Sequence, residues 1–430
     1  MRRYEEYKAT GVEWMPKIPE HWEAIKLKWV CSFVYGESLS SDVRIEGGVP
    51  VFGSNGVTGV HNASITGAPC IIVGRKGSFG RINYCIEPCF PIDTTYYVDQ
   101  RVTKHHVRWL YYALGILGLD RISKDTGVPG LSREDAYDHI VSVPPLREQR
   151  TIARFLDDKT TQIDQLITQK QKMLELLQEE RAALINHAVT KGLDATAPLR
   201  DSGIEWLGEV PAHWEVKRLK WIAEIQGGLA LSSGKILTNP VTLPYLRVAN
   251  VQDGYLDLEE IKMVEVEEDQ INRYSLQKGD LLMNEGGDND KLGRGCVWRG
   301  EIEPCLHQNH VFAVRLFDGY SPEWLNLVTT TESARIHFLT RAKQSTNLAS
   351  ISSTNIKELP VVLPPVDEQY EILDFVTEES ARIVELTSTI NQEITLLQEY
   401  RAALIAEAVT GQVDVRNYEP ASISTAELVG

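Results

Sequence analysis

Residues that could bind metal or phosphate occur in short groups, but each group lacks a required member. Cys305, His307 and His310 offer zinc ligands, yet no second pair with matching spacing accompanies them. Segment 227–236, GGLALSSGKI, is similar to a phosphate-binding loop, but Ile236 stands where that loop needs Ser or Thr. The sequence therefore predicts neither a structural metal nor a phosphate loop.

Acidic residues near position 290 imitate a calcium-binding loop. The stretch DNDKLG at 288–293 has the right beginning, because Asp288 and Asp290 stand at the first and third positions. However, Leu292 occupies the fifth position of such a loop, and Arg299 stands at the twelfth in place of Glu. We therefore expect no calcium site there.

Two further groups resemble enzyme motifs only loosely. Asp257, Glu260 and Lys262 echo the carboxylate–lysine set of nucleases, a match that charged strands often produce. The Asn239–Pro240 pair is followed by Val-Thr, so it is not the Asn/Asp-Pro-Pro-aromatic motif of amino-methyltransferases. No Ser/His/Asp pattern stands out either. We predict that the chain alone is not an enzyme and holds no catalytic residue, cofactor or metal.

The composition is typical of a protein that folds in water in a reducing compartment. The 430 residues exceed the usual size of one domain. No apolar run approaches the roughly 18 residues that a bilayer span needs, and the N-terminus lacks an apolar targeting segment. We expect a cytoplasmic location and no membrane contact. The six cysteines have no regular spacing, which favours free thiols over disulfides: Cys31, Cys70, Cys85, Cys89, Cys296 and Cys305.

Acidic charge is distributed unevenly along the chain. The formal net charge of −16 at first argues against nucleic-acid binding. Residues 364–412, however, carry 10 acidic and 2 basic residues, whereas residues 22–143 carry 12 of each. Residues 214–363 carry 20 acidic and 16 basic residues, and 144–192 carry 7 and 8. Local basic faces therefore remain possible within residues 22–143 and 214–363. A more basic partner would help any DNA binding.

Much of the sequence occurs twice. Residues 10–30 return as 202–222 at an offset of 192, and residues 143–190 return as 363–410 at an offset of 220. The stretches between these repeats do not resemble each other. A chain that duplicates its frame and diversifies the inserts is expected to present two different binding heads.

A heptad pattern follows each repeated PP-x-x-EQ motif and predicts a coiled-coil seam. Lys170 interrupts the first seam and is a candidate for fixing its register. The seam rows are Leu156, Ile163, Lys170, Leu177 and Leu184 in the first copy and Val376, Ile383, Ile390, Leu397 and Leu404 in the second. The companion rows are Ile152, Lys159, Leu166 and Met173, and Ile372 and Leu386.

The ends of both helical segments are marked by residues that suit helix boundaries. Pro144–Pro145 and Pro364–Pro365 cannot lie inside a helix, and Gly192 and Gly411 stand where a left-handed cap would follow the last turn. Each helix of about 40 residues would be roughly 60 Å long. The two helices are each other's obvious partners, and we interpret the pair as a spacer; a simple joint between domains is the alternative.

The regions between the helices have β-branched runs broken by Asn-Gly and Gly pairs, which predict strands and turns. Short helices are expected at 108–117 and 321–339. The predicted fold class is α+β: two globular α/β heads joined by two long antiparallel helices that form a coiled coil, with a pseudo-two-fold internal repeat. The expected parts are 1–21 (shared motif), 22–143 (head), 144–192 (helix), 193–213 (junction), 214–363 (head), 364–412 (helix) and 413–430 (tail).

Several motifs resemble those of one family. PPLREQ (144–149) and PPVDEQ (364–369), with the helices that follow them, are similar to the conserved regions of type I restriction–modification specificity (S) subunits. The junction GIEWLGEVPAHWEVKRLK and its N-terminal copy are similar to that family too. VFGSNGVTG with IIVGRKGSFG resembles one class of its target-recognition domains, and YLRVANVQDG with HQNHVFAVR resembles another.

The resemblance implies a DNA-reading scaffold. Each head would be a target-recognition domain for one half of an asymmetric bipartite site in double-stranded DNA, and the helices would set the spacer. Two methyltransferase subunits and two restriction/translocase subunits would dock on the chain. Those partners, and not this chain, would use S-adenosylmethionine, ATP and Mg²⁺. A head separation below about 60 Å corresponds to fewer than about 18 base pairs.

Base reading needs polar side chains on turns, chiefly Arg or Lys for guanine and Asn or Gln for adenine. Arg75, Lys76 and Lys343 are the candidates best suited to phosphate. The candidates are Ser54, Asn55, Arg75, Lys76, Ser78 and Arg81 in the first head and Arg247, Asn250, Asn284, Arg294, Gln308, Asn309, Lys343 and Gln344 in the second.

The repeated frame offers candidates for partner docking: Glu148, Gln149, Arg181, Glu368, Gln369 and Arg401. Capping or packing of their own helices explains these residues equally well. The repeated Trp14, Trp22, Trp206 and Trp214 are expected to pack in the frame, since duplicated aromatics more often belong to a core. Two rival functions remain: a coiled-coil adaptor whose heads bind proteins, and a self-contained nuclease or methyltransferase with an unrecognised motif.

Overall fold

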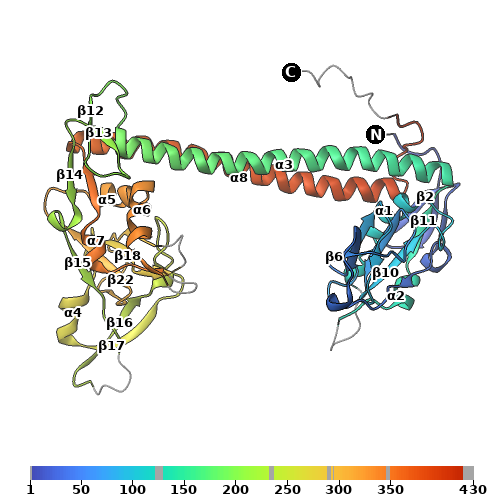
Figure 1. Ribbon diagram of the computed structural model, residues 1–430, viewed down its shortest axis with the longest axis horizontal. Helices are drawn as coiled ribbons and strands as arrows, with labels where there is room; N and C mark the ends of the chain where they lie inside the picture. Colours follow the sequence, from blue (N-terminus) through green and yellow to red (C-terminus); the bar gives the residue numbers. More distant parts are fainter. Residues whose placement is uncertain are drawn as a thin grey trace. The chain divides into compact units, whose positions relative to one another are not determined.

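The computed structural model describes residues 2–121, 129–231, 237–287, 292–293, 295–344 and 349–419. The chain divides into two compact units, Met1–Gln171 with Asn391–Gly430, and Lys172–Ile390. Each unit holds one globular head and part of each of two long helices (Figure 1). Among the described residues, no helix combines the length and apolar character needed to cross a bilayer.

The two long helices begin and end where the sequence predicts. Helix α3 (Leu146–Lys191) and helix α8 (Val366–Val409) each start directly after a Pro-Pro pair. They contain 46 and 44 residues, slightly more than expected. Gly192 and Gly411 follow them with φ of 76° and 73°, which confirms the left-handed caps.

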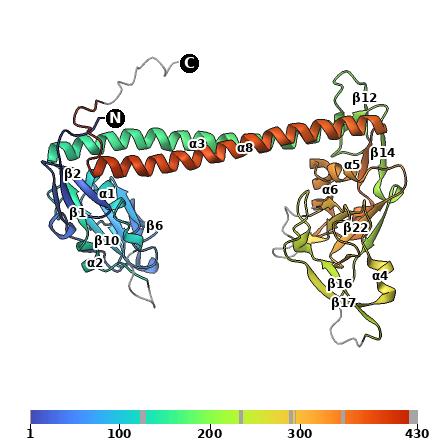
Figure 2. The ribbon, with the colours of Figure 1, turned by 180° about the vertical axis from the view of Figure 1, so that it is seen from behind.

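The helices run antiparallel within each unit, as Figure 2 also shows. In the first unit, Lys170 lies opposite Glu393 and Asp164 lies opposite Arg401, so a step back along α3 is a step forward along α8. The core of that unit includes Leu156 and Leu404, and the core of the second includes Ile372 and Val376 from the predicted rows. The companion rows are buried only at Ile152 and Ile372 among their apolar members, whereas Leu166, Met173 and Leu386 are 45%, 44% and 40% exposed.

Lys170 makes a cross-helix ion pair at its interruption of the seam. Its Nζ lies 2.5 Å from Glu393 Oε2, and both side chains are partly exposed. Exposed ion pairs contribute roughly 0–1 kcal/mol. We expect Lys170→Met to change the free energy of unfolding of the first unit by less than about 1 kcal/mol, because the methionine adds apolar contact as the ion pair disappears. A double-mutant cycle with Glu393→Gln in chemical denaturation measures the coupling; a value above about 2 kcal/mol would contradict this.

The first head is built from two small sheets and a covering helix. A four-stranded antiparallel sheet has the order β4-β10-β7-β8, and a second sheet has the order β6-β5-β9 with β9 parallel to β5. Helix α1 packs on β7 and β8. The elements are β4 (Val34–Tyr35), β5 (Val49–Gly53), β6 (Gly56–His61), β7 (Cys70–Gly74), β8 (Ile82–Cys85), β9 (Phe90–Pro91), β10 (Thr95–Asp99), α1 (Val107–Gly115) and α2 (Arg133–Tyr137).

The second head repeats these two sheets strand for strand despite its unrelated sequence, and adds a third sheet of order β19-β24-β23. Its four-stranded sheet has the order β15-β22-β18-β20, and its second sheet, β17-β16-β21, again has one antiparallel and one parallel pair. The elements are β15 (Ala223–Gly227), β16 (Pro240–Leu246), β17 (Lys262–Glu267), α4 (Glu268–Tyr274), β18 (Leu281–Asn284), β19 (Gly286–Gly287), β20 (Gly295–Val297), β21 (Leu306–His307), β22 (Val311–Leu316), α5 (Pro322–Thr329), α6 (Glu332–Arg341), β23 (Lys343–Gln344), β24 (Ala349–Ser350) and α7 (Ser353–Lys357).

The covering helices of the two heads share their buried residues. Helix α1 buries Trp109 and Leu110, and α5 buries Trp324 and Leu325. Both helices were expected from the sequence, but the predicted segment 321–339 is divided into α5 and α6. The break follows from Thr331, whose hydroxyl caps the second helix at the backbone N–H of Ala334.

The repeated frame attaches each head to a long helix in the same way. Strand β3 pairs with β11 in the first copy, and β14 pairs with β25 in the second. Trp22 and Trp214 are buried, as predicted, whereas Trp14 is 47% exposed and Trp206 is partly exposed, so that prediction is wrong for Trp14. The frame strands are β1 (Tyr7–Val12), β2 (Met15–Pro19), β3 (Glu23–Lys26), β11 (Ile140–Val143), β12 (Leu199–Asp201), β13 (Glu209–Pro211), β14 (Glu215–Arg218) and β25 (Pro360–Leu363).

Candidate nucleic-acid interface

The candidates of the first head gather on two adjacent turns. Ser54 and Asn55 form the turn between β5 and β6, and residues 75–81 connect β7 to β8. Arg81 donates a hydrogen bond to Asn55 Oδ1, and the Ser54 side chain lies beside Gly74 and Gly77. The two turns therefore form one polar surface, to which Lys76 and Ser78 contribute as exposed side chains.

Close backbone packing fixes the turn between β7 and β8. A Cβ on Gly74 would lie 2.2 Å from the carbonyl oxygen of Ser78, so only glycine fits there. Gly77 and Gly80 both have a φ of 72°, which other residues rarely adopt. The glycines of the GRKGSFG stretch thus hold Arg75, Lys76, Ser78 and Arg81 on a tightly defined loop.

Contacts within the head hold the Arg75 side chain in place. Its Nε donates to the carbonyl oxygen of Asp93 at 3.1 Å, and its guanidinium lies 5.2 Å from the Tyr35 ring centroid. Arg133 lies 5.0 Å from the same ring. Tyr35 is 46% exposed, so two guanidinium groups flank an accessible aromatic ring. Sequence reasoning missed Tyr35 and Arg133, because they are distant in the chain from the Gly-rich loop.

In the second head, five candidates lie near the turn that follows β16: Arg247, Asn250, Asn284, Gln308 and Asn309. The backbone N–H of Val248 donates to Gln308 Oε1 at 3.3 Å, and Asn284 Nδ2 donates to the carbonyl of Val248 at 3.4 Å. Asn309 follows Gln308 and contacts His310. Arg247 begins the same turn, and its Nη2 donates to the carbonyl oxygen of Glu260 at 3.4 Å.

Two of these candidates, Asn250 and Asn284, are buried and make their hydrogen bonds within the head. Asn250 is 3% exposed; its Oδ1 accepts from the backbone of Arg247, and its Nδ2 donates to the carbonyls of Asp257 and Glu260. Asn284 is also 3% exposed, and its Nδ2 donates to Val251 at 3.0 Å. Both amides spend their donors inside the head. Lys343 is exposed on β23, whereas Arg294 and the side chain of Gln344 lie outside the described residues.

The common strand plan shows which loops of the two heads correspond. The backbone N–H of Leu131 donates to Arg75 in the first head, as that of Ile351 donates to Glu285 in the second. Arg75 N–H donates to Thr94, as Glu285 N–H donates to His310. Glu285 therefore takes the place of Arg75 at the start of the turn.

The loop after the parallel strand corresponds as well. Gln308 and Asn309 in the second head take the place of Ile92 and Asp93 in the first, since each pair follows the strand that lies parallel to β16 or β5. The chemistry differs at matching positions. Glu285 binds His310 through a 2.7 Å contact, whereas its counterpart in the first head is a cation, Arg75.

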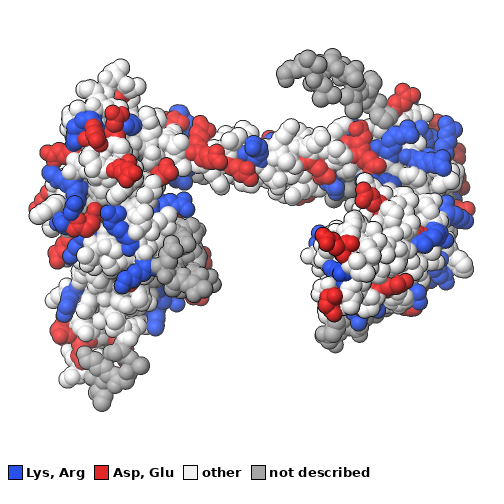
Figure 3. All heavy atoms as spheres, in the orientation of Figure 1, with Lys and Arg blue, Asp and Glu red and all other residues white. Residues whose placement is uncertain are grey.

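A second basic area of the first unit lies outside the predicted set. Arg108, Arg150 and Arg154 line an open pocket of about 600 Å³ between α1 and α3. Arg108 is held by Asp157 at 2.6 Å and by three tyrosine rings, while Arg150 and Arg154 are exposed. Basic and acidic side chains otherwise alternate over both units in the view of Figure 3. The spacing of two arginines four residues apart on a helix was the available sequence signal.

Glu148 and Glu368, which were predicted as docking residues, accept hydrogen bonds within the chain. His21 Nε2 and Trp22 Nε1 contact the two oxygens of Glu148 at 2.7 and 3.0 Å. His213 and Trp214 contact Glu368 at 2.7 and 2.8 Å. We call each set of three a His-Trp-Glu staple. It ties the frame to the first turn of a long helix, which gives both glutamates a structural role.

The neighbouring glutamines are also internal. Gln149 and Gln369 are 1% and 6% exposed, and each donates to the carbonyl of the first proline of its Pro-Pro pair. Gln149 also contacts His105, whose pKa is lowered by burial, so the imidazole is neutral. Arg401 forms a bidentate pair with Asp164, and Arg181 donates to Ser380 Oγ at 3.4 Å. These contacts between the long helices explain both arginines. Arg401 is partly exposed and Arg181 is exposed.

Among the described residues, His307 and His310 do not gather with Cys305 as metal ligands would. His307 Nδ1 contacts the carbonyl of Val311 at 2.7 Å, and burial lowers its pKa. His310 contacts Glu285 instead of Cys305. Segments 227–236 and 288–293 lie partly outside the described residues.

Comparisons with known proteins agree with the duplicated architecture. A family model described as "Type I restriction modification DNA specificity domain" matches residues 19–176 and again 211–396. The specificity subunit of type I restriction enzyme EcoKI from Escherichia coli K12 is 27% identical over 278 residues, which cover 64% of this chain and 57% of that protein. The EcoBI specificity subunit of Escherichia coli is 24% identical over 361 residues, covering 80% and 73%.

Solved structures share the fold at low sequence identity. A chain from a study of assembly and conformational transition of the type I R-M system matches with a TM-score of 0.67 at 12% identity, covering 92% of this chain and 99% of that one. The HsdS subunit of Thermoanaerobacter tengcongensis matches with a TM-score of 0.51 at 13% identity, covering 92% and 98%.

Proposed function

Because this chain belongs to the type I restriction–modification DNA specificity family, we propose that it is the sequence-specificity subunit of a type I restriction–modification complex. Each head, 22–143 or 214–363, reads one half of an asymmetric bipartite site. One observation carries this proposal: two heads share a strand plan and a frame but present different side chains on corresponding loops. Such a pair suits two different half-sites and not a palindrome.

The reading surface of the first head consists of Asn55, Arg75, Lys76, Ser78 and Arg81. Arg81 and Asn55 are the base-reading pair, since guanidinium and amide groups match the major-groove edges of guanine and adenine. Lys76 and Ser78 are exposed on the same loop and suit phosphate contacts, which position the head without reading sequence.

The second head reads with Gln308, Asn309, Arg294 and Lys343. Gln308 and Asn309 lie on the loop that corresponds to Ile92 and Asp93, next to His310, which contacts Glu285. Their amides suit adenine. The acidic Glu285 next to them excludes the close phosphate approach that Arg75 supports in the first head, so the two heads meet their half-sites differently.

The helices α3 and α8 act as the spacer and as the docking surface for methyltransferase subunits. Exposed apolar residues line them, including Leu166, Met173, Leu176, Val384 and Leu396. A solvated coiled coil keeps such residues few, so these exposed apolar side chains favour further helices packing alongside. Both copies of the repeated helix carry such residues, which supports two copies of the partner.

Chemistry belongs to the partner subunits under this proposal. The methyltransferase subunits use S-adenosylmethionine to methylate adenine, and the restriction/translocase subunits use ATP and Mg²⁺. Purified chain incubated with DNA and either S-adenosylmethionine or Mg²⁺ should show no turnover.

Methylome sequencing tests the proposal directly. Cells that express this chain with its methyltransferase should show one asymmetric bipartite motif, with modified adenine on both strands. Replacing residues 22–143 by the head of another such chain should change one half of the motif completely and leave the other half as it was. A change in both halves would contradict the assignment of one head to one half-site, and a palindromic motif would contradict the proposal as a whole.

A further inference from the structure

Three cysteines of the first head converge although their spacing in the sequence suggests no site. Cys70 begins β7, Cys85 ends β8, and Cys89 precedes β9. Their Sγ atoms all lie within 4.8 Å of one another, and all three residues are buried. Cys70 and Cys85 are direct partners across the antiparallel β7–β8 pair, which explains how distant residues meet.

The distances between the sulfurs match those of thiolates around one metal ion. Cys70 Sγ and Cys89 Sγ are 3.5 Å apart, too far for the S–S bond of about 2.05 Å. Ligands at about 2.3 Å from a zinc-like ion lie roughly 3.8 Å from each other in tetrahedral geometry. The Cys70–Cys89 separation is close to this value, and the third sulfur lies within 4.8 Å of both, so the three thiols can share one ion.

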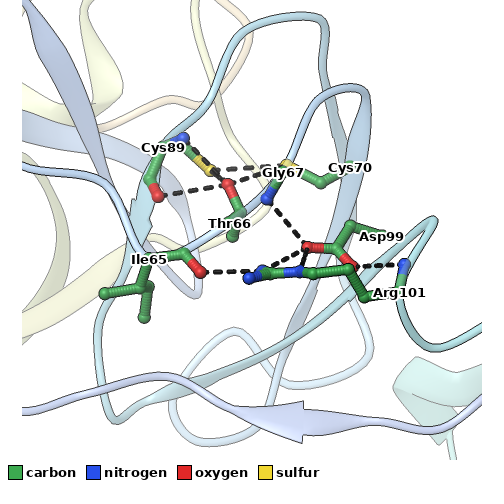
Figure 4. Close-up of polar contacts among 7 residues, drawn as sticks. All are labelled: Ile65, Thr66, Gly67, Cys70, Cys89, Asp99 and Arg101. Atoms are coloured by element: carbon green, nitrogen blue, oxygen red, sulfur yellow. Dashed lines mark hydrogen bonds and ion pairs between the residues drawn. The ribbon is translucent and has the colours of Figure 1, made fainter.

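Polar groups around the sulfurs support their role as ligands. Thr66 is 6% exposed, and its Oγ1 lies 3.4 Å from Cys89 Sγ and 3.5 Å from Cys70 Sγ, as Figure 4 shows. The backbone N–H of Cys89 donates to the same hydroxyl at 2.9 Å, which orients it. Hydrogen bonds of this kind orient ligands and stabilise thiolates in metal centres. Phe52 and Ile72 pack with the three cysteines in a buried apolar cluster.

We propose that Cys70, Cys85 and Cys89 bind one soft, thiophilic metal ion of the Zn²⁺ class. Binding forms three metal–sulfur bonds and releases the three thiol protons to solvent, so that a divalent ion gives a complex of net charge −1. Thiolates select soft ions of this kind over Mg²⁺ or Ca²⁺. The sequence predicted free thiols and no metal, because only strand pairing reveals the group.

The site would anchor the loop that reads DNA. The ion joins the first residue of β7 and the last residue of β8, and the turn between these strands carries Arg75 to Arg81. The ion thus closes the base of the hairpin and limits the motion of its tip. This consequence rests on the proposed function, whereas metal binding itself does not.

Metal titration of the purified full-length chain, without DNA, tests the proposal. The chain is reduced and freed of metal, and Cd²⁺ is added as a spectroscopic probe. We expect a thiolate-to-Cd²⁺ charge-transfer band that saturates at one ion per chain, and competition by Zn²⁺ against a chromophoric chelator. Cys85→Ala should lower Zn²⁺ affinity by more than about 100-fold, and Thr66→Val by about 10-fold. Cys305→Ala, a buried cysteine of the second head, is the matched control and should bind as the parent chain does.

A band that persists in Cys85→Ala, or its absence in the parent chain, would overturn the proposal. A Cys70–Cys89 disulfide in the metal-free chain, found by alkylation and mass spectrometry, would overturn it as well. If Cys85→Ala does not fold, Thr66→Val carries the test, because it removes a hydroxyl and leaves all three thiols. A negative result leaves the proposed function untouched, since methylome sequencing measures that independently.

Discussion

Replacing Glu148 by Ala should destabilise the first unit by about 3 kcal/mol, because a net hydrogen bond contributes roughly 1 kcal/mol and a buried unpaired donor costs more. Three side chains lose their acceptor together: His21, Trp22 and Tyr4, whose hydroxyl donates to Glu148 at 3.0 Å. Trp22 is fully buried, so its indole N–H would find no water. Burial and the charge of Glu148 raise the pKa of Tyr4, which therefore stays a donor.

The second copy of the staple provides a matched comparison. Among the described residues, Glu368 accepts from His213 and Trp214, and its side chain is 37% exposed against 13% for Glu148. Glu368→Ala should therefore cost the second unit less, about 2 kcal/mol. Hydrogen exchange followed by mass spectrometry reads each unit separately, through the peptides of β3 and β14. Losses below about 1 kcal/mol would show that the staples do not hold the heads, and equal losses would contradict the predicted difference between the two copies.

Glutamine separates the hydrogen bonds from the charge. Glu148→Gln keeps one oxygen acceptor for Trp22, so more than half of the stability that Glu148→Ala removes should return. A variant that behaves like Glu148→Ala would indicate that the interaction with His21 dominates. In both variants, a loosened frame lets the first head move on its helix. Binding to a bipartite DNA site should therefore weaken, while the DNA sequence that is recognised stays the same.

The frame could be predicted from the sequence because each of its rules acts over a few residues. Proline pairs end any preceding structure, heptads mark a helical seam, and Gly192 and Gly411 satisfy a left-handed cap. Duplication made these signals visible twice. Their partners across the molecule, such as Trp22 for Glu148, were not predictable, because a Glu at a helix start suits capping as well as docking.

The common plan of the two heads was hidden because strand pairing joins distant residues. Sheet order depends on which apolar strands meet, and many sequences satisfy the same pairing. One local signal existed: Trp-Leu occurs at 109–110 and again at 324–325, in the covering helix of each head. This pair recurs at an offset that differs from those of the two repeats, so the sequence alone did not show that the two helices correspond.

The candidate site was predicted in part for a similar reason. Asn favours turns because its amide bonds to nearby backbone, and it also suits adenine recognition, so sequence alone cannot separate Asn250 from Asn55. The structure separates them by burial. The thiols Cys70 and Cys85 are opposite each other only because β7 and β8 pair in that register.

Arg81→Ala should reduce binding of the assembled methyltransferase complex to its target by about 5- to 150-fold, the equivalent of roughly 1–3 kcal/mol for a bidentate base contact. The loss should fall on one base pair: sites altered at that position should be bound almost as well by the variant as by the parent. Lys76→Ala is the matched contrast on the same loop. Removing a phosphate-binding cation there should weaken binding evenly across sequences and reduce the slope of log affinity against log salt by about 1.

The hydrogen bond between Arg81 and Asn55 complicates this interpretation, and a third variant resolves it. Asn55→Ala breaks the same contact between the two turns but leaves the guanidinium in place. If the contact matters only for loop position, Asn55→Ala should lower affinity as much as Arg81→Ala does and keep the preference at the affected base pair. Competition binding with a panel of single-base variants of the first half-site measures both effects. Even losses for Arg81→Ala across the panel would assign the residue to phosphate, and unchanged affinity would remove this turn from the interface, leaving the arginines between α1 and α3 as the basic surface to test.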